Sequence, residues 1–147
     1  MKRPEPTGWH RRKYWINALG LLAPIWFLYA SLTPVFPPPW ETKTTGQITV
    51  TPSQHDEGAP YEHDGVRVKD FSFRFCDGCR ETIRLASASV GLAPAAPTAV
   101  EDGLVHGQGN LQEAHVPYPA RLSGNERLWF SVQTWDGALH HIDWPLR

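Results

Sequence analysis

The sequence is poor in sulfur-containing residues. It contains two cysteines and one methionine in 147 residues. Neither a phosphate-binding loop, nor a pair of catalytic carboxylates, nor a serine–histidine–aspartate order is recognisable. These absences argue against a classical hydrolase. The sequence does not decide whether the chain is an enzyme, and it favours a protein that is not one.

Charge of both signs is missing from the stretch 14–40, and the two flanking parts differ in sign. Residues 1–13 hold five basic residues and one acidic residue, a balance of +4. Residues 41–147 hold nine basic and fourteen acidic residues, a balance of −5. An acidic domain gives no reason to expect nucleic-acid binding, which relies on phosphate contacts from basic residues.

The uncharged stretch predicts a transmembrane helix over residues 14–36, with Pro24 as a kink. A helix of this length spans ~35 Å, against a hydrocarbon core of ~30 Å. Aromatic residues of the kind that settle at membrane interfaces lie on both sides, at Trp9, Tyr14 and Trp15 and at Phe36 and Trp40.

The basic cluster before the helix sets the expected orientation. The positive-inside rule places residues 1–13 in the cytoplasm and the C-terminal domain in the periplasm or outside the cell. A cleaved signal peptide is the alternative, but the apolar run is long and the cleavage site is poor, because Pro34 follows Ser31-Leu32-Thr33. We therefore expect an uncleaved, single-pass signal-anchor with Met1 retained.

After a proline-rich spacer at 37–46, residues 47–147 show the alternation and turn signals of an all-β domain. Asp136-Gly137 predicts a hairpin. Residues 93–99 and 100–112 are expected to be loops. The pattern favours an immunoglobulin-like antiparallel β-sandwich. The predicted strands are Gln47–Thr51, Val66–Phe75, Glu81–Ser89, Arg127–Trp135 and Ala138–Trp144.

Two details of these strands can be compared with a structure. Leu128, Phe130 and Val132 share one face of their strand, so that face is the expected core side. In the strand 66–75 the apolar phase changes at Lys69-Asp70, which indicates a bulge or bend.

The sharpest chemical signal is Cys76-Asp77-Gly78-Cys79. Asp-Gly favours a tight turn, so we expect a hairpin with the cysteines facing each other at a solvent-accessible tip, their Cα atoms ~5–6 Å apart. Three chemistries remain open: a structural disulfide, a redox pair, or two thiolate ligands for Cu(I) or half of a zinc site. Copper is the candidate cofactor. Its site would consist of the two thiolates and a histidine that folding brings near.

Four histidines are weaker metal candidates. His55 and His63 lie in acidic segments that could bind a divalent ion weakly, although solvated loop charge is the favoured explanation. His140 and His141 are adjacent on a predicted strand, so they point to opposite faces and do not easily serve one site.

Three tryptophans, Trp129, Trp135 and Trp144, fall in the final hairpin. They are either core residues or anchors for docking a partner, because tryptophan is enriched at both places. The sequence thus favours a membrane-anchored extracytoplasmic accessory or interaction protein, such as a small subunit or assembly factor that binds a membrane-protein partner. The alternative function is a copper-binding or thiol-redox protein that uses Cys76 and Cys79.

Overall fold

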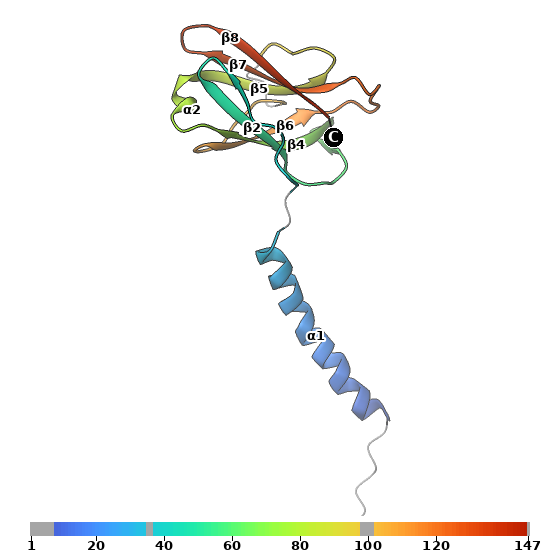
Figure 1. Ribbon diagram of the computed structural model, residues 1–147. Coiled ribbons are helices and arrows are strands. Elements are labelled where there is room, and N and C mark those ends of the chain that lie inside the picture. Colours follow the sequence, from blue (N-terminus) through green and yellow to red (C-terminus); the bar gives the residue numbers. More distant parts are fainter. Residues whose placement is uncertain (1–7, 35–36, 98–101, 147) are drawn as a thin grey trace, which may run out of the picture. The chain divides into compact units, whose positions relative to one another are not determined.

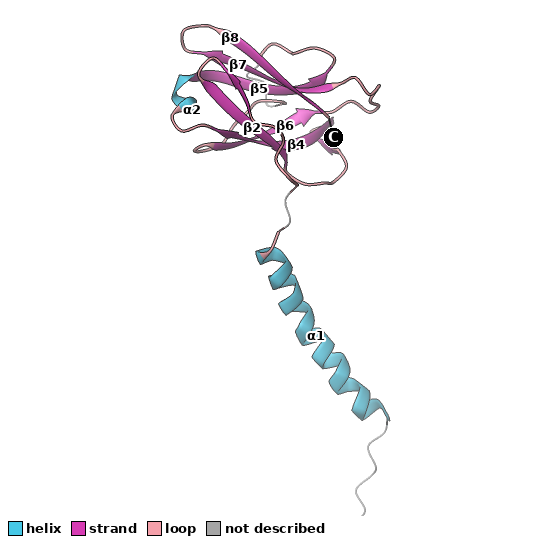
Figure 2. Cartoon of the chain, viewed as in Figure 1, coloured by secondary structure: helices cyan, strands magenta, loops and turns pink. Residues whose placement is uncertain are grey.

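The computed structural model describes residues 8–34, 37–97 and 102–146 and divides the chain into two units, Met1–Val35 and Phe36–Arg147. The first unit holds a single helix, and the second holds the strands (Figures 1 and 2). The first seven residues of the expected tail, Phe36 and the segment 98–101 of the expected loops lie outside the described residues.

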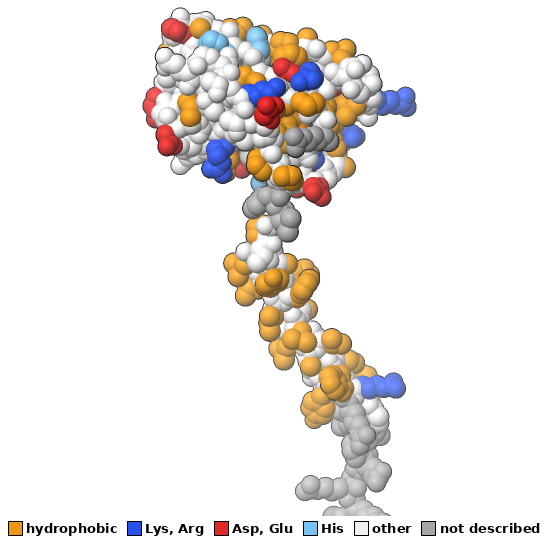
Figure 3. Space-filling view, in the orientation of Figure 1, with side chains coloured by type: hydrophobic (Ala, Val, Ile, Leu, Met, Phe, Trp, Pro, Cys, Tyr) orange, Lys and Arg blue, Asp and Glu red, His pale blue; other side chains and the backbone are white. Residues whose placement is uncertain are grey.

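Helix α1 (Gly8–Leu32) has 25 residues and runs through Pro24. Its segment Arg12–Leu32 is long and apolar enough to cross a membrane. Large apolar side chains are exposed along it, and Figure 3 shows them covering the visible face of the helix. The helix begins six residues before the expected span, because Trp9 and the basic residues that follow continue the same helical backbone.

The second unit is mostly antiparallel β-structure in two sheets. One sheet has the order β1-β2-β4-β3, with β6 also paired to β4; the other has the order β5-β7-β8. Figure 1 shows these sheets as two layers. The elements are β1 (Lys43–Thr45), β2 (Ile48–Gln54), β3 (Tyr61–His63), β4 (Val66–Phe75), α2 (Cys79–Thr82), β5 (Ile83–Gly91), β6 (Leu111–Pro117), β7 (Arg127–Thr134) and β8 (Leu139–Pro145).

The core lies between the two sheets. Leu128, Phe130 and Val132 are fully buried, which confirms the face predicted from the alternation of β7. The ring of Phe130 lies 5.4 Å from that of Phe73 and 5.8 Å from that of Phe75, centroid to centroid. These contacts between β7 and β4 join the sheets through apolar side chains.

The phase change in β4 has a different cause from the predicted bulge. The register between β4 and β6 is continuous from Val68 to Arg74. Lys69 is buried, and its ammonium group donates to the carbonyl oxygens of Asp56 and Gly58. A lysine therefore occupies an inward position at the end of the sheet, and neighbouring carbonyls satisfy its charge.

The first part of the expected spacer belongs to the fold. Trp40 is only 6% exposed, packs edge-on against Phe71 and donates its backbone N–H to Pro52. Strand β1 then pairs with β2. The three prolines before Trp40 concealed this role in the sequence, because they marked the whole segment as extended chain.

The segment 103–106 closes one side of the unit by joining an edge of each sheet. Gly103 accepts a hydrogen bond from Ala88 N–H of β5 and donates its own N–H to His115 of β6. Three positions further on, the backbone of His106 exchanges both hydrogen bonds with Glu113. This crossing fixes the position of His106 beside β6.

Candidate functional site

The two cysteines form a disulfide at the crossing from one sheet to the other. Cys76 follows β4 and Cys79 begins α2, and their Cα atoms lie 5.4 Å apart, as predicted. The expected hairpin is wrong, because β4 and β5 lie in different sheets and do not pair. Gly78 has a positive φ of 75°, but Asp77 does not, so the turn differs from the paired left-handed form that the Asp-Gly signal favours.

The surroundings of the disulfide are more closed than a loop tip. Cys79 is 5% exposed and Cys76 is half-buried. The backbone N–H of Thr49 donates to Cys76 Sγ at 3.2 Å, and the carbonyl oxygen of Gln47 lies 3.3 Å from Cys79 Sγ. The expected accessible pair is therefore only half accessible, through Cys76.

Folding does not complete the expected copper site. In the part of the chain that the structure describes, no group of three or more histidine, cysteine, aspartate or glutamate side chains is arranged to hold a metal ion. The disulfide also ties up both sulfurs, so a soft metal would require prior reduction of the pair.

The four histidines named from the sequence lie in separate places. His55 follows β2, where its N–H donates to Asp70 O, and lines a hollow beside Pro37 and Pro39. His140 and His141 point to opposite faces of β8: His140 contacts Thr45, and His141 Nδ1 lies 2.8 Å from Ser131 Oγ. His63, in contrast, belongs to a cluster.

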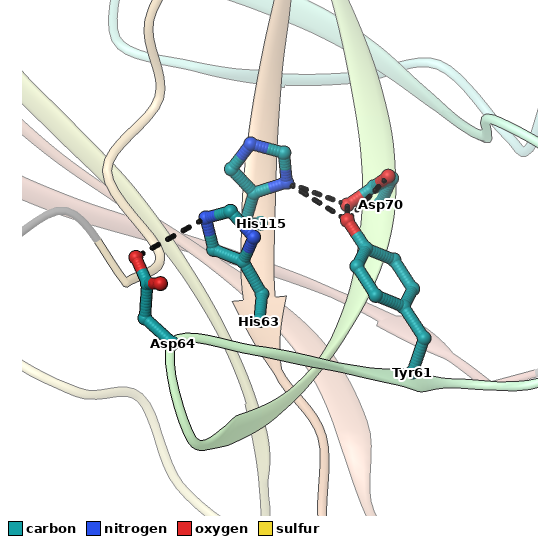
Figure 4. A network of polar contacts seen from close by, with 5 residues as sticks. All are labelled: Tyr61, His63, Asp64, Asp70 and His115. Carbon is teal, nitrogen blue, oxygen red and sulfur yellow. Dashed lines mark hydrogen bonds and ion pairs between the residues drawn. The ribbon is translucent and has the colours of Figure 1, made fainter.

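This histidine cluster consists of His63, His106 and His115 together with Asp70 and Tyr61, and Figure 4 shows all of them except His106. The His115 ring lies 4.9 Å from that of His63 and 5.7 Å from that of His106, centroid to centroid. His115 Nδ1 is 2.7 Å from a carboxylate oxygen of Asp70, and the Tyr61 hydroxyl donates to the same carboxylate.

The contact with the Asp70 carboxylate holds the His115 imidazole in one orientation. The same carboxylate also acts on the Tyr61 hydroxyl. Partial burial, followed by the hydrogen bond to Asp70 and its negative charge, raises the pKa of the Tyr61 phenol. Tyr61, Asp70 and His115 were not expected from the sequence, because no local motif links strands that are far apart in the chain. The Asp-Gly pair after His63 was the available signal, since it makes the β3–β4 hairpin that brings Tyr61 beside Asp70.

A second feature is an open hollow of about 610 Å³ beside the disulfide, which we call the arginine cleft. Its charged and polar lining consists of Arg80, Glu81, Arg84, His106 and Gln112, with Trp135 on one side. Arg80 comes from α2 and Arg84 from β5. His106 belongs to both features, so the cleft and the histidine cluster are adjacent.

The three tryptophans occupy three different environments. Trp144 is 1% exposed, and its indole N–H donates to Glu41 O. Trp129 is half-buried and donates to Gly91 O at 3.1 Å. Trp135, at the β7–β8 turn, is 68% exposed.

A family model described as "Uncharacterised conserved protein UCP029505" matches residues 8–147. The chain belongs to this family. The match covers both the helix and the β unit and begins at Gly8, where α1 begins. Neither a curated protein nor a solved structure matches the chain.

Proposed function

We propose that the protein is a membrane-anchored accessory protein whose β-domain lies outside the cytoplasm and binds a membrane-protein partner. The main observation in favour of partner binding is the exposed side chain of Trp135. The apolar helix supports the anchor, and the strand order supports a binding domain.

The support for an anchor is the length and surface of α1. Its 25 residues correspond to ~37 Å of helix, enough for the hydrocarbon core of a bilayer. The large apolar side chains along it are exposed, which favours their burial in a medium other than water. The excess of basic residues before the uncharged run favours a cytoplasmic N-terminus.

The order of strands supports an immunoglobulin-like sandwich, a fold that commonly serves as a binding module. Strands β2, β4 and β6 form one antiparallel group, and β5, β7 and β8 form the other. This order resembles that of strands A, B and E against C, F and G in such domains, with β1 and β3 as additions to the first sheet.

Trp135 has the properties of an interface anchor. It is the most exposed large apolar residue of the β7–β8 hairpin, and hollows of about 610 and 490 Å³ adjoin it. Its backbone N–H donates to Thr82 O, which ties it to α2 and the disulfide behind it. A large aromatic on a fixed backbone loses little conformational freedom on binding, which is why tryptophan is enriched among residues that dominate binding energy.

The test is co-purification of the tagged full-length chain in mild detergent, with quantitative mass spectrometry of its partners. We expect Trp135→Ala to lose a partner that the wild type retains. Leu92→Ala is the matched control, because Leu92 is 69% exposed and lies in a different loop. Equal recovery of every partner by both variants would contradict the proposal.

A second candidate function is thiol–disulfide exchange at Cys76. The observation that favours it is the N–H donated by Thr49, which stabilises negative charge on a half-buried sulfur. A partner dithiol would attack Cys76 Sγ and release Cys79 as a thiol. The partner's second thiol would then displace Cys76, leaving the partner oxidised and this pair reduced. Trapping of free thiols in intact cells separates the two candidates, since the accessory role predicts a permanently oxidised pair and the exchange role predicts a pair that is partly reduced.

A further inference from the structure

We propose that the arginine cleft binds an acidic segment of the partner protein, with an aspartate or glutamate seated between Arg80 and Arg84. This inference rests on the proposed function, because it specifies what the docking face around Trp135 recognises.

The two guanidinium groups are available to a ligand. Both arginines are exposed, and neither makes a hydrogen bond or an ion pair within the described residues. Three other cations of the unit are engaged: Lys43 donates to Asp143 O, Lys69 is held by Asp56 and Gly58, and Arg127 pairs with Asp143. The side chains of Arg67, Arg74 and Arg121 make no such contact within the described residues, but none of them lines this hollow. Arg80 and Arg84 are distinguished because both line the same hollow.

The charge around the cleft is opposite to the charge of the domain. Residues 41–147 carry a net charge of −5, from nine basic and fourteen acidic residues. The cleft has two arginines against one carboxylate, Glu81, which also lines the neighbouring hollow. An acidic partner is repelled by most of the domain and attracted here, so charge favours one docking position over the others.

The chemistry of the lining favours a carboxylate on a peptide. The planar fork of an arginine matches a carboxylate with two parallel hydrogen bonds. Ile83 and Val105 add apolar walls, and Trp135 adds an aromatic face, which suit the side chains beside an acidic residue. An anionic lipid surface is the other source of negative charge, but it is usually held by clusters of ~4–8 basic residues. Two arginines with a glutamate between them in sequence fit a single carboxylate better.

The test uses the full-length chain in native membranes with a photo-crosslinking residue at position 106, an exposed position that lines the cleft, and at position 121 as a control. We expect a crosslink at position 106 to a partner peptide that contains Asp or Glu near the site of attachment. Arg80→Glu/Arg84→Glu should lower recovery of that partner about tenfold or more, as loss of two charge-assisted contacts predicts. Arg67→Glu/Arg121→Glu makes the same change in net charge at exposed positions outside the cleft and should leave recovery within about twofold.

The outcomes separate this inference from the proposed function. If Trp135→Ala loses the partner but the cleft variant behaves like its control, the docking function stands and the acidic-segment inference is wrong. Crosslinks from position 106 to lipid, or to a peptide without acidic residues, also overturn it. Restored binding of Arg80→Glu/Arg84→Glu to a partner whose crosslinked acids are changed to lysine confirms it. If the wild type retains no partner, both proposals fail.

Discussion

Tryptophans have different roles in this domain, and the position of each on the backbone determines whether its side chain is buried or exposed. Trp144 points inward from β8 and donates to Glu41 O, so it joins the end of the chain to the segment that enters the domain. Trp135 lies at the turn of the same hairpin, where no opposing sheet covers its ring. The two residues should therefore respond differently to truncation.

We predict that Trp144→Ala lowers the free energy of unfolding by ~3–5 kcal/mol, because it empties a buried site of indole size. Trp135→Ala should change it by no more than ~0.5 kcal/mol, the usual range for an exposed position. Thermal unfolding of the full-length chain in detergent measures both. A large loss of stability for Trp135→Ala would show that this residue is structural, and its use as a docking probe would then fail.

A second prediction at this scale concerns Glu126. Its carboxylate accepts hydrogen bonds from the backbone N–H and hydroxyl of Ser123 and from Gly124 N–H, which lowers the pKa of Glu126 to about 2 from an ordinary 4.5. The contribution of this group is fully present above pH 4.5 and is lost as the pH falls through about 2.

We therefore expect Glu126→Gln to speed amide hydrogen exchange at Ser123 and Gly124 at pH 6. The difference from the wild type should fall to about half near pH 2 and disappear below it. A nuclear magnetic resonance titration of the Glu126 carboxyl provides the direct check, and a midpoint near 4.5 would contradict the proposed hydrogen bonds.

At the scale of elements, the hairpin β7–β8 was predictable and the cysteine turn was not. Asp136-Gly137 lies between two alternating strands, and the side chain of Asp136 closes the turn by accepting from Thr134 and Ala138. Asp77-Gly78 gives the same local signal, but the signal does not say whether the flanking strands pair. There the chain crosses to the other sheet through α2.

Strand β6 and the turn between β3 and β4 were not predicted from the sequence, for different reasons. Strand β6 was missed because its inward residues include Gln112 and Ala114, which weaken the apolar alternation. Asp64-Gly65, in contrast, forms the two-residue turn between β3 and β4, with both residues at positive φ, yet its neighbours looked like a polar loop. The histidine cluster depends on β6 and on this turn together, so it could not be assembled from sequence alone.

The segment that joins the sheet edges provides a prediction at this scale. Gly103 has a φ of +84°, and a Cβ placed there would lie 2.5 Å from Ala88 O. Gly103→Ala should destabilise the domain by ~2–5 kcal/mol through a left-handed backbone and a backbone clash. Gly109→Ala is the matched control, because Gly109 has a φ of +70° but open space, so only ~1–2 kcal/mol is expected. Equal losses for the two variants would mean that the crossing tolerates displacement.

The disulfide also acts on one element, the crossing from β4 to β5. Its loop is short, so Cys76→Ala/Cys79→Ala should cost only about 2 kcal/mol or less in the chain-entropy account. We expect thiol trapping in intact cells to find the pair oxidised and the double variant to retain the partner. A reducible pair, or a variant that is stable but loses function, would favour the exchange role instead.

At the scale of the whole molecule, charge and hydrophobicity change along the chain in three successive parts. Basic residues come first, an uncharged apolar helix follows, and a net-acidic domain with one basic cleft comes last. The same asymmetry underlies both the proposed orientation and the proposed partner, because the positive-inside rule acts on the first segment and charge steering acts on the last.

The orientation is the last prediction. A C-terminal alkaline phosphatase fusion should be active, and a C-terminal green fluorescent protein fusion should be dark, because phosphatase matures only outside the cytoplasm and green fluorescent protein folds poorly after export. Both fusions should migrate at the mass of the uncleaved chain. A variant with Lys2, Arg3, Arg11, Arg12 and Lys13 changed to glutamine should lower phosphatase activity, since these five residues supply the positive charge before the helix. A fluorescent fusion with an inactive phosphatase would overturn the topology, and it would also remove the oxidising compartment that the disulfide requires.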